Sequence, residues 1–322
     1  MPKGKVASGL DAVWKQYEEY LQPGNKDQSD RMRFPSGIPS LDIAVGGMQG
    51  MTRGIVEILG GEAVGKTTLA FTILAQTQRN GKLRDIEAPD GNIYNALYLD
   101  SEHSYDNKYA AALGVDTGKM LVLDMMYAQD QFQVIEYFLE AGIQFIIIDS
   151  ISVLIPKSEE EKELDDNQKV ADEANVLSRV TKRMNALAAY ADALVIAINQ
   201  YRANMSQMAH TDKKGYGAWV LRYLKKVTIE LTRIERKETR MTIQAFVQKN
   251  KMGAIGKKIT YEIEHGKGID IDHHILMLAE HHDIVNKNGK TWWYYTDNAG
   301  IEYKGQGEQN AVKNFPMEEI KK

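Results

Sequence analysis

Short apolar runs of strand length alternate with longer runs of helical periodicity through the middle of the chain. This alternation predicts a mostly parallel sheet whose strands are joined by crossover helices. One run, Phe145-Ile146-Ile147-Ile148, is continuously apolar, which is typical of a strand buried on both faces. The strands predicted in this part are residues 55–59, 96–100, 120–123, 145–149 and 194–199. The pattern therefore predicts an α/β core.

The pattern changes near each end of this core. From Val227 onward, strand-like runs at 227–234, 241–247 and 259–263 follow one another across short turns, which predicts antiparallel pairing. Residues 8–21 have the spacing of an amphipathic helix, which must pack on this subunit's core or on a neighbour. We therefore expect an N-terminal oligomerisation helix and linker (1–32), a core (33–268) and a small C-terminal α/β lobe with a charged tail (269–322).

Composition narrows the class of protein. Of 322 residues, 43% are hydrophobic, 26% are charged and none is cysteine, so disulfides and thiolate metal sites are excluded. No apolar stretch approaches membrane-spanning length, and the N-terminus lacks the apolar core of a signal peptide, so we expect a cytoplasmic protein. The net charge is −4, so any binding of nucleic acid must come from a local concentration of basic residues.

A phosphate-binding P-loop lies between a predicted strand and a helix-forming run. Gly60, Gly65, Lys66 and Thr67 satisfy the pattern G-x-x-x-x-G-K-[ST]. Backbone N–H groups of such a loop surround phosphate oxygens, while the lysine reaches the β- and γ-phosphates and the threonine hydroxyl holds Mg²⁺. The residues expected around the nucleotide are Gly60, Gly61, Glu62, Ala63, Val64, Gly65, Lys66, Thr67 and Thr68. The chain is predicted to bind a nucleoside triphosphate.

Three further predicted strands end in polar side chains, where open α/β sheets bind their ligands. Asp149 is the expected second Mg²⁺ residue, although a strand-end aspartate can also cap a turn. Glu102 can polarise an attacking water, or instead cap a helix that starts near Tyr105 and Asp106. Gln200 can report whether the γ-phosphate is present, although alone it would more often be a loop residue.

A long polar stretch from Tyr201 to Gly217 follows Gln200, and loops of this length are usually functional or disordered. The span 201–226 has a local net charge of +5, which fits a nucleic-acid surface or, equally on charge alone, a solvated loop. Its basic residues are Arg202, Lys213, Lys214, Arg222, Lys225 and Lys226.

Other patterns favour ordinary structure over chemistry. The doublets His273-His274 and His281-His282 flank a helical run, and we interpret them as exposed helix ends rather than metal ligands. Trp292-Trp293-Tyr294-Tyr295 can stack bases but is more typical of a packed strand. Lys249-Asn250-Lys251 is, on its own, a surface turn.

The motifs, in their order along residues 30 to 305, resemble those of RecA-type homologous recombinases. The matching strings are 36–44, 54–59 with the P-loop, 100–103, 109–116, 146–150, 198–200 and 249–251. The resemblance implies a RecA-type P-loop ATPase core with a mixed central sheet. It also implies ATP and Mg²⁺ as cofactors, and a helical filament on single-stranded DNA that pairs with double-stranded DNA and exchanges strands.

Matching the motifs residue by residue implies roles. Glu102 corresponds to the catalytic carboxylate and Gln200 to the γ-phosphate sensor, while Asp106 and Tyr109 correspond to residues that contact adenine. Lys249 and Lys251 correspond to lysines that reach the ATP of the adjacent subunit, as an arginine finger does. The stretch 201–217 falls at the second DNA-binding loop, the N-terminal helix at the polymerisation helix, and Arg222 and Tyr223 at the subunit boundary. The expected DNA contacts are Lys169, Arg202, Lys213, Lys214, Gly215 and Gly217.

The chain departs from the family in four places, one of which is the second DNA loop, where the aromatic residue expected near its tip is missing and Met205 and Met208 are the only large apolar candidates. Residues 157–170, at the first DNA loop, hold six acids, three lysines and no glycine, and a net charge of −3 repels phosphate. Only the lysines there, chiefly Lys169, are suited to contact DNA. Residues 83–94 form an insertion, and the C-terminal lobe is short.

Two rival hypotheses are a hexameric RecA-fold helicase-type motor and a scaffold that uses ATP only as a structural ligand. The N-terminal helix and the lysines at 249 and 251 argue against the motor.

Overall fold

The computed structural model describes residues 15–16, 31–47, 49–125, 127–151, 182–201, 225–289 and 291–320. Contacts divide the chain into one unit from Met1 to Arg31 and a second from Met32 to Lys322. In the first unit, the described residues Lys15 and Gln16 are helical and exposed, within the predicted amphipathic helix. The remainder of that prediction lies outside the described residues.

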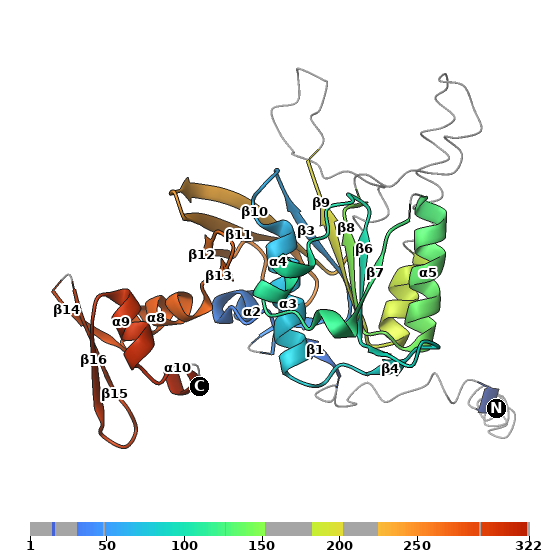
Figure 1. Ribbon diagram of the computed structural model, residues 1–322. Helices are drawn as coiled ribbons and strands as arrows, with labels where there is room; N and C mark the ends of the chain where they lie inside the picture. Colours follow the sequence, from blue (N-terminus) through green and yellow to red (C-terminus); the bar gives the residue numbers. More distant parts are fainter. Residues whose placement is uncertain are drawn as a thin grey trace, which may run out of the picture. The chain divides into compact units, whose positions relative to one another are not determined.

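A mixed sheet forms the centre of the second unit (Figure 1). Strands β3, β9, β8, β6 and β7 pair in parallel, and β10 pairs in parallel with β3. The neighbouring pairs β10–β11, β11–β12 and β12–β13 are antiparallel. Within the described residues the order is β13 (Gly268–Ile269), β12 (Lys258–Glu264), β11 (Arg240–Asn250), β10 (Val227–Arg236), β3 (Gly54–Gly60), β9 (Leu194–Asn199), β8 (Phe145–Asp149), β6 (Ala96–Asp100) and β7 (Met120–Leu123).

Helices cover both faces of this sheet, because the alternating side chains of its strands are apolar on each side. In β8, Ile147 packs in a core with α2 (Pro39–Gly46), α3 (Lys66–Arg79) and α4 (Asn107–Ala112). Ile146 and Ile148 of the same strand pack in a second core with α5 (Ala128–Ala141) and the helical residues 182–190. All five residues of β8 are buried, which confirms the prediction of a strand covered on both sides.

Smaller elements lie around the core. The predicted insertion at 83–94 contains a hairpin of β4 (Ile86–Glu87) and β5 (Ile93–Tyr94), whose turn is held by Asp90 accepting bonds from Asn92 and Tyr94. The strands β1 (Arg33–Phe34) and β2 (Met51–Thr52) pair with each other, and the 3₁₀ turn η1 (Thr117–Lys119) precedes β7.

The C-terminal part is an α/β lobe with its own apolar core. Trp293 and Tyr295 are buried in that core while Trp292 and Tyr294 face outward, so the aromatic run is a strand, as predicted. The lobe consists of α8 (Ile271–His281), β14 (Asn286–Asn288), β15 (Trp292–Thr296), β16 (Glu302–Gln306), α9 (Glu308–Asn314) and α10 (Met317–Ile320).

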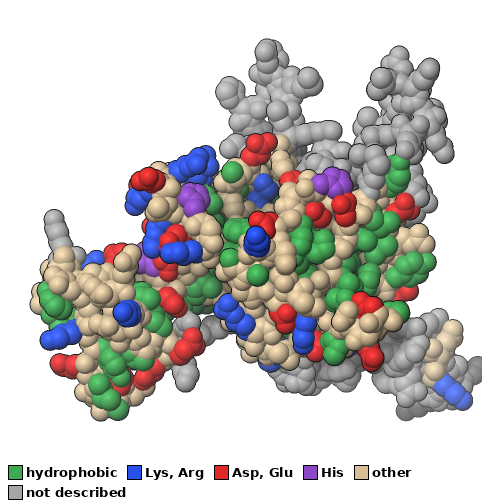
Figure 2. All heavy atoms as spheres, viewed as in Figure 1, with side chains coloured by type: hydrophobic (Ala, Val, Ile, Leu, Met, Phe, Trp, Pro, Cys, Tyr) green, Lys and Arg blue, Asp and Glu red, His purple; other side chains and the backbone are tan. Residues whose placement is uncertain are grey.

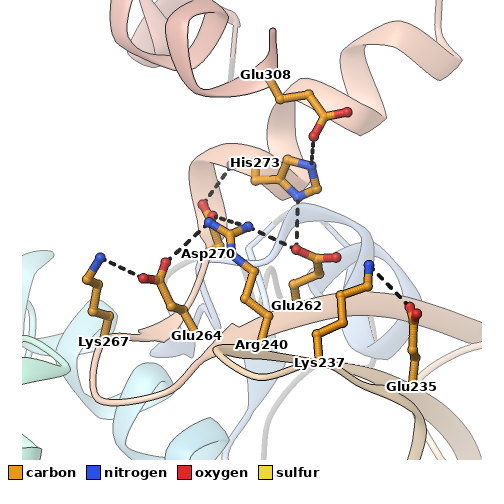
Figure 3. A network of polar contacts seen from close by, with 9 residues as sticks. All are labelled: Glu235, Lys237, Arg240, Glu262, Glu264, Lys267, Asp270, His273 and Glu308. Carbon is orange, nitrogen blue, oxygen red and sulfur yellow. Dashed lines mark hydrogen bonds and ion pairs between the residues drawn. The ribbon is translucent and has the colours of Figure 1, made fainter.

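The prediction that His273 and His274 are exposed was wrong. The first turn of α8 packs against the core, so His274 is 9% exposed and its Nε2 lies 2.8 Å from Ser40 Oγ. His273 lies between Glu308 and Glu262 (Figure 3), with Nε2 3.2 Å and Nδ1 3.9 Å from the respective carboxylates. His281 and His282 are exposed, as predicted.

Polar contacts join the lobe to the sheet at the same place (Figure 3). Arg240 of β11 contacts Glu262, Glu264 and Asp270 at 3.0 to 3.3 Å. These side chains are about one quarter exposed, so each pair contributes at most about 1 kcal/mol. Within the described part of the chain, no helix is both long and apolar enough to cross a membrane, and no cluster of three or more His, Cys, Asp or Glu side chains is placed to hold a metal.

Candidate functional site

The P-loop has the strand–loop–helix geometry that its sequence predicts. β3 ends at Gly60 and α3 begins at Lys66. Gly65, which precedes the helix, has φ of +80°, and a Cβ there would lie 2.4 Å from Ile263 Cδ1. A side chain at that position would be both strained and obstructed. The loop therefore requires glycine at Gly65, and it presents the amino end of α3 toward the space in front of it.

Lys66 lies back along the loop, with Nζ donating to the Gly61 carbonyl at 2.6 Å. Burial lowers the pKa of Lys66, while the carboxylates of Glu102, Asp149 and Glu62 partly oppose that shift. A cation held between carboxylates and a glycine-rich loop suits the binding of a multiply charged anion.

Thr67 and Asp149 lie together beside this lysine. The Thr67 hydroxyl donates to Asp149 Oδ2 at 2.6 Å, and the Tyr98 hydroxyl donates to the same oxygen at 2.9 Å. Asp149 is 2% exposed, and burial raises its pKa against the opposing effect of those two hydrogen bonds. A hydroxyl and a carboxylate form the hard oxygen set that Mg²⁺ prefers, so the residues present fit this metal ion.

Glu102 lies across from the P-loop, next to two other strand ends. Its Oε1 accepts from Ser150 Oγ at 2.6 Å and from Gln200 Nε2 at 2.9 Å. The alternative that Glu102 caps a helix is wrong, since Asp106 is the N-cap of α4. The adjacent strands β6, β8 and β9 thus bring Glu102, Ser150 and Gln200 to one edge of the sheet.

Together with the P-loop and Asp149, the side chains of Glu102 and Gln200 line a cavity of about 400 Å³. Its walls are Glu62, Ala63, Val64, Gly65, Lys66, Thr67, Thr68, Glu102, Asp149 and Gln200. A larger hollow of about 850 Å³ lies between α2, α3 and the start of α8, but it lacks a comparable group of phosphate- and metal-binding side chains. We therefore assign the chemistry to the smaller cavity.

The predicted adenine residues lie on α4 and its cap. The Tyr109 hydroxyl is 2.7 Å from Thr68 Oγ1, so this ring is joined to the P-loop helix. Asp106 accepts hydrogen bonds from the backbone N–H groups of Lys108 and Tyr109 and is exposed.

Lys249 and Lys251 lie at the end of β11 and in the turn after it, and neither lines the cavity. Burial first, and then the nearby cations Lys251 and Lys225, lower the pKa of Lys249 to about 8, whereas the Glu57 carboxylate acts in the opposite direction. The predicted residues Lys169, Arg202, Lys213, Lys214, Gly215, Gly217, Arg222 and Tyr223 lie outside the described residues.

Sequence reasoning missed Tyr98 and Ser150. Tyr98 falls inside an apolar strand, and its contact with Asp149 depends on the pairing of β6 with β8. Ser150 directly follows the predicted metal carboxylate, and that position was the available signal. The sequence also gave no indication of an ion pair between Glu57 of β3 and Lys225, whose positions are 168 residues apart.

Comparison with known proteins adds an independent finding. A family model described as the RecA N-terminal domain matches residues 6–270. Protein RecA of Mannheimia haemolytica is 30% identical over 321 residues, which cover 96% of this chain and 81% of that protein. Protein RecA of Roseiflexus sp. (strain RS-1) is 31% identical over 285 residues, or 86% and 75% of the two chains. Protein RecA of Lactobacillus delbrueckii subsp. bulgaricus (strain ATCC 11842) is 29% identical over 326 residues, or 97% and 93%.

Proposed function

The chain belongs to the RecA family, so we infer that it is a DNA-dependent ATPase of homologous recombination, with ATP and Mg²⁺ as its cofactors. The observation that carries this inference at the level of side chains is the meeting of Glu102, Gln200, Lys66 and Asp149 around one cavity. Family membership does not favour the helicase-type motor, and no contact in the described residues favours it either.

The proposed division of labour follows from the contacts. Lys66 and the loop N–H groups hold the phosphates, and Thr67 and Asp149 hold Mg²⁺, which neutralises phosphate charge. Glu102 orients the attacking water, because its carboxylate faces the cavity and already accepts two hydrogen bonds from neighbouring donors. Gln200 detects the γ-phosphate, since its amide can exchange Glu102 for a phosphate oxygen. Tyr109 and Asp106 contact the base.

We propose that the site is completed by a second subunit in a helical filament. Lys249 and Lys251 lie outside the cavity of their own subunit, which supports their action on a neighbour's nucleotide. Cations supplied in this way stabilise transition-state charge and make hydrolysis depend on assembly. The N-terminal segment 1–32 would form the polymerisation contact, with Arg222 and Tyr223 at the boundary between subunits.

The DNA surface belongs to the same proposal. Arg202, Lys213 and Lys214 would contact the phosphates of single- and double-stranded DNA, with Gly215 and Gly217 allowing close backbone approach and Lys169 contributing from the first loop. The core would span 33–268 and the lobe 269–322, and the protein would act in the cytoplasm.

Steady-state ATP turnover, measured with and without single-stranded DNA over a range of protein concentrations, tests this function. We expect DNA to stimulate turnover and dilution to reduce it. Glu102→Gln should lower kcat by about 100-fold or more while leaving ATP binding intact. The matched control is Glu87→Gln, which neutralises an exposed carboxylate of β4.

Each rival has its own outcome. Turnover that ignores DNA, or a Glu102→Gln variant with wild-type kcat, would contradict the proposed mechanism and favour the scaffold. Electron micrographs with DNA, Mg²⁺ and ATP should show helical filaments, whereas closed rings would favour the motor.

A further inference from the structure

A charged pair is buried in the sheet beside the nucleotide cavity. Glu57 lies in β3, three residues before the P-loop begins, and only 2% of its side chain is exposed. The ammonium group of Lys225, which is 12% exposed, forms an ion pair with it. A buried carboxylate is costly unless it is paired, and an apolar residue would serve the sheet at least as well. The pair is therefore weak evidence for stability and invites a functional explanation.

The other oxygen of Glu57 faces the phosphate-sensing strand. Asn199, which is fully buried, donates from Nδ2 to Glu57 Oε1 at 2.9 Å. The amide oxygen of the same side chain accepts from the backbone N–H of Gln200 at 2.9 Å. Because the carboxylate can only accept, it fixes which end of the Asn199 amide faces Gln200. A continuous set of contacts thus joins Lys225, through Glu57 and Asn199, to the residue that donates to Glu102.

The pair also lies beside Lys249. In the sheet register, Thr228 of β10 lies opposite Glu57 on one side and opposite Lys249 on the other. Residues opposite one another in a ladder share a face of the sheet, so all three side chains lie on one face. Within the part of the chain that the structure describes, Lys251 and Lys225 lower the pKa of Lys249 and Glu57 raises it, so the two members of the pair act with opposite signs.

We propose that Glu57 and Lys225 are positioning residues for ATP hydrolysis, which orient Gln200 through Asn199 and balance the charge beside Lys249. This inference rests on the proposed function, because it takes Gln200 and Lys249 as participants in the reaction. It extends that function because it links two residues within one subunit: Gln200, whose amide is proposed to detect the γ-phosphate, and Lys249, which is proposed to act on the neighbouring subunit's nucleotide.

Kinetics provide the first test. We expect Lys225→Met to lower DNA-stimulated kcat by about tenfold while KM for ATP changes less than about twofold, because the P-loop contacts are untouched. Lys225→Arg should recover most of the loss, since it restores the cation. The control is Arg53→Met, which removes the ion pair with Asp192 near the start of the same strand and should leave both parameters unchanged.

A second test reads the charge of Lys249 without catalysis. Labelling of lysine side chains with acetic anhydride between pH 6.5 and 10, followed by mass spectrometry, gives the pKa of Lys249 in the full-length protein. Lys225→Met removes a cation, so the Lys249 pKa should rise, and the alkaline limb of kcat should move to higher pH. Glu57→Gln removes an anion and keeps an acceptor for Asn199, so both should move to lower pH. A shift of one pKa unit is a tenfold change in the protonation equilibrium.

The outcomes decide separately on the pair and on the function. The inference would be overturned if Lys225→Met and Glu57→Gln left both kcat and the Lys249 pKa unchanged. It would also be overturned if the two variants shifted the Lys249 pKa in the same direction, or if Lys225→Arg failed to restore the kcat lost in Lys225→Met. If Lys225→Met does not fold, the double variant Glu57→Gln/Lys225→Met, which leaves no charge buried at the pair, carries the test. It should return the Lys249 pKa toward the wild-type value. A wild-type protein whose turnover ignores DNA would refute the proposed function, whereas the labelling result would still decide on the charge balance.

Discussion

At the scale of single residues, one oxygen of Asp149 accepts hydrogen bonds from the hydroxyl groups of both Thr67 and Tyr98. Burial and the nearby carboxylates raise the pKa of Tyr98, so its hydroxyl keeps its proton and donates to the carboxylate. The ring packs in a cluster with Phe71 and Tyr105, whose centroids are 5.1 and 5.4 Å away, so it is held independently of that hydroxyl. Tyr98 therefore fixes the orientation of a carboxylate proposed to hold Mg²⁺, as outer ligands of metal sites do.

Tyr98→Phe isolates this effect, because it removes only the hydroxyl. We expect the Mg²⁺ concentration for half-maximal turnover to rise about tenfold, with a loss of about 1 kcal/mol in the free energy of unfolding. A magnesium titration of ATP turnover measures the first quantity and urea unfolding the second.

The matched control is Tyr261→Phe. Tyr261 is also fully buried, but its hydroxyl has no hydrogen-bond partner among the described residues. Removing that hydroxyl should leave the Mg²⁺ requirement unchanged and should not destabilise the protein. An equal Mg²⁺ requirement in wild type and Tyr98→Phe would remove Tyr98 from the site.

At the scale of elements, the C-terminal lobe depends on one close approach between a strand and the helix after it. Gly305 of β16 lies so near α9 that a Cβ there would be 2.5 Å from the backbone of Ala311. Ala311 is fully buried in the lobe core with Trp293 and Phe315. The helix can cover that core only if the strand carries no side chain at this point.

Gly305→Ala should therefore push α9 away from the sheet and cost about 1–3 kcal/mol of lobe stability. Turnover per folded molecule should be unchanged, because the cavity is formed by other elements. Hydrogen exchange in α9 measures the first effect. Gly46→Ala is the control, since a Cβ there meets its nearest neighbour at 3.6 Å, an ordinary contact. Unchanged protection of α9 would show that the approach is not limiting.

Local patterns were sufficient for the central strands and insufficient for contacts between distant segments. The predictions at 96–100, 120–123, 145–149 and 194–199 coincide with β6, β7, β8 and β9, because an apolar run ended by a polar residue marks a buried strand directly. β10 and β11 extend beyond their predicted ends, where exposed polar residues continue the pairing. The prediction that His274 is exposed failed because His274 contacts Ser40, which lies 234 positions away in the sequence. Helical periodicity within a short segment does not reveal such a contact.

The candidate site divides in the same way. The P-loop, Asp149, Glu102 and Gln200 could be named from the sequence, since each occupies a strand end whose neighbours are predictable. Glu57 could not be named from the sequence, because its proposed role depends on its contacts with Lys225 and Asn199, which lie far away in the sequence. The roles of all these residues remain predictions.

At the scale of the whole molecule, the net charge of −4 gives no general attraction to DNA. On the face shown in Figure 2, acidic and basic side chains are interspersed over the coloured surface. Binding must therefore depend on a local set of cations, and one such set, with a net charge of +5, lies between residues 201 and 226.

The double reversal Lys213→Glu/Lys214→Glu should weaken binding to single-stranded DNA and flatten its dependence on salt, because fewer counterions are released. Fluorescence anisotropy at several salt concentrations gives both the affinity and the slope. Lys82→Glu, at an exposed lysine of the core, is the control and should change the affinity much less. An unaltered slope in the double variant would exclude these lysines from the DNA surface.

The strand that carries the P-loop and the strand that carries Lys249 belong to one hydrogen-bonded sheet, with only β10 between them. If Lys249 acts on the neighbouring subunit's nucleotide as proposed, one continuous sheet carries both the residues that hold one nucleotide and the lysine that reaches the next. In a polymer of such subunits, the interval between successive nucleotides would be a fixed length standard. Any stretching of the polymer would then have to occur at the joints between subunits and not inside them.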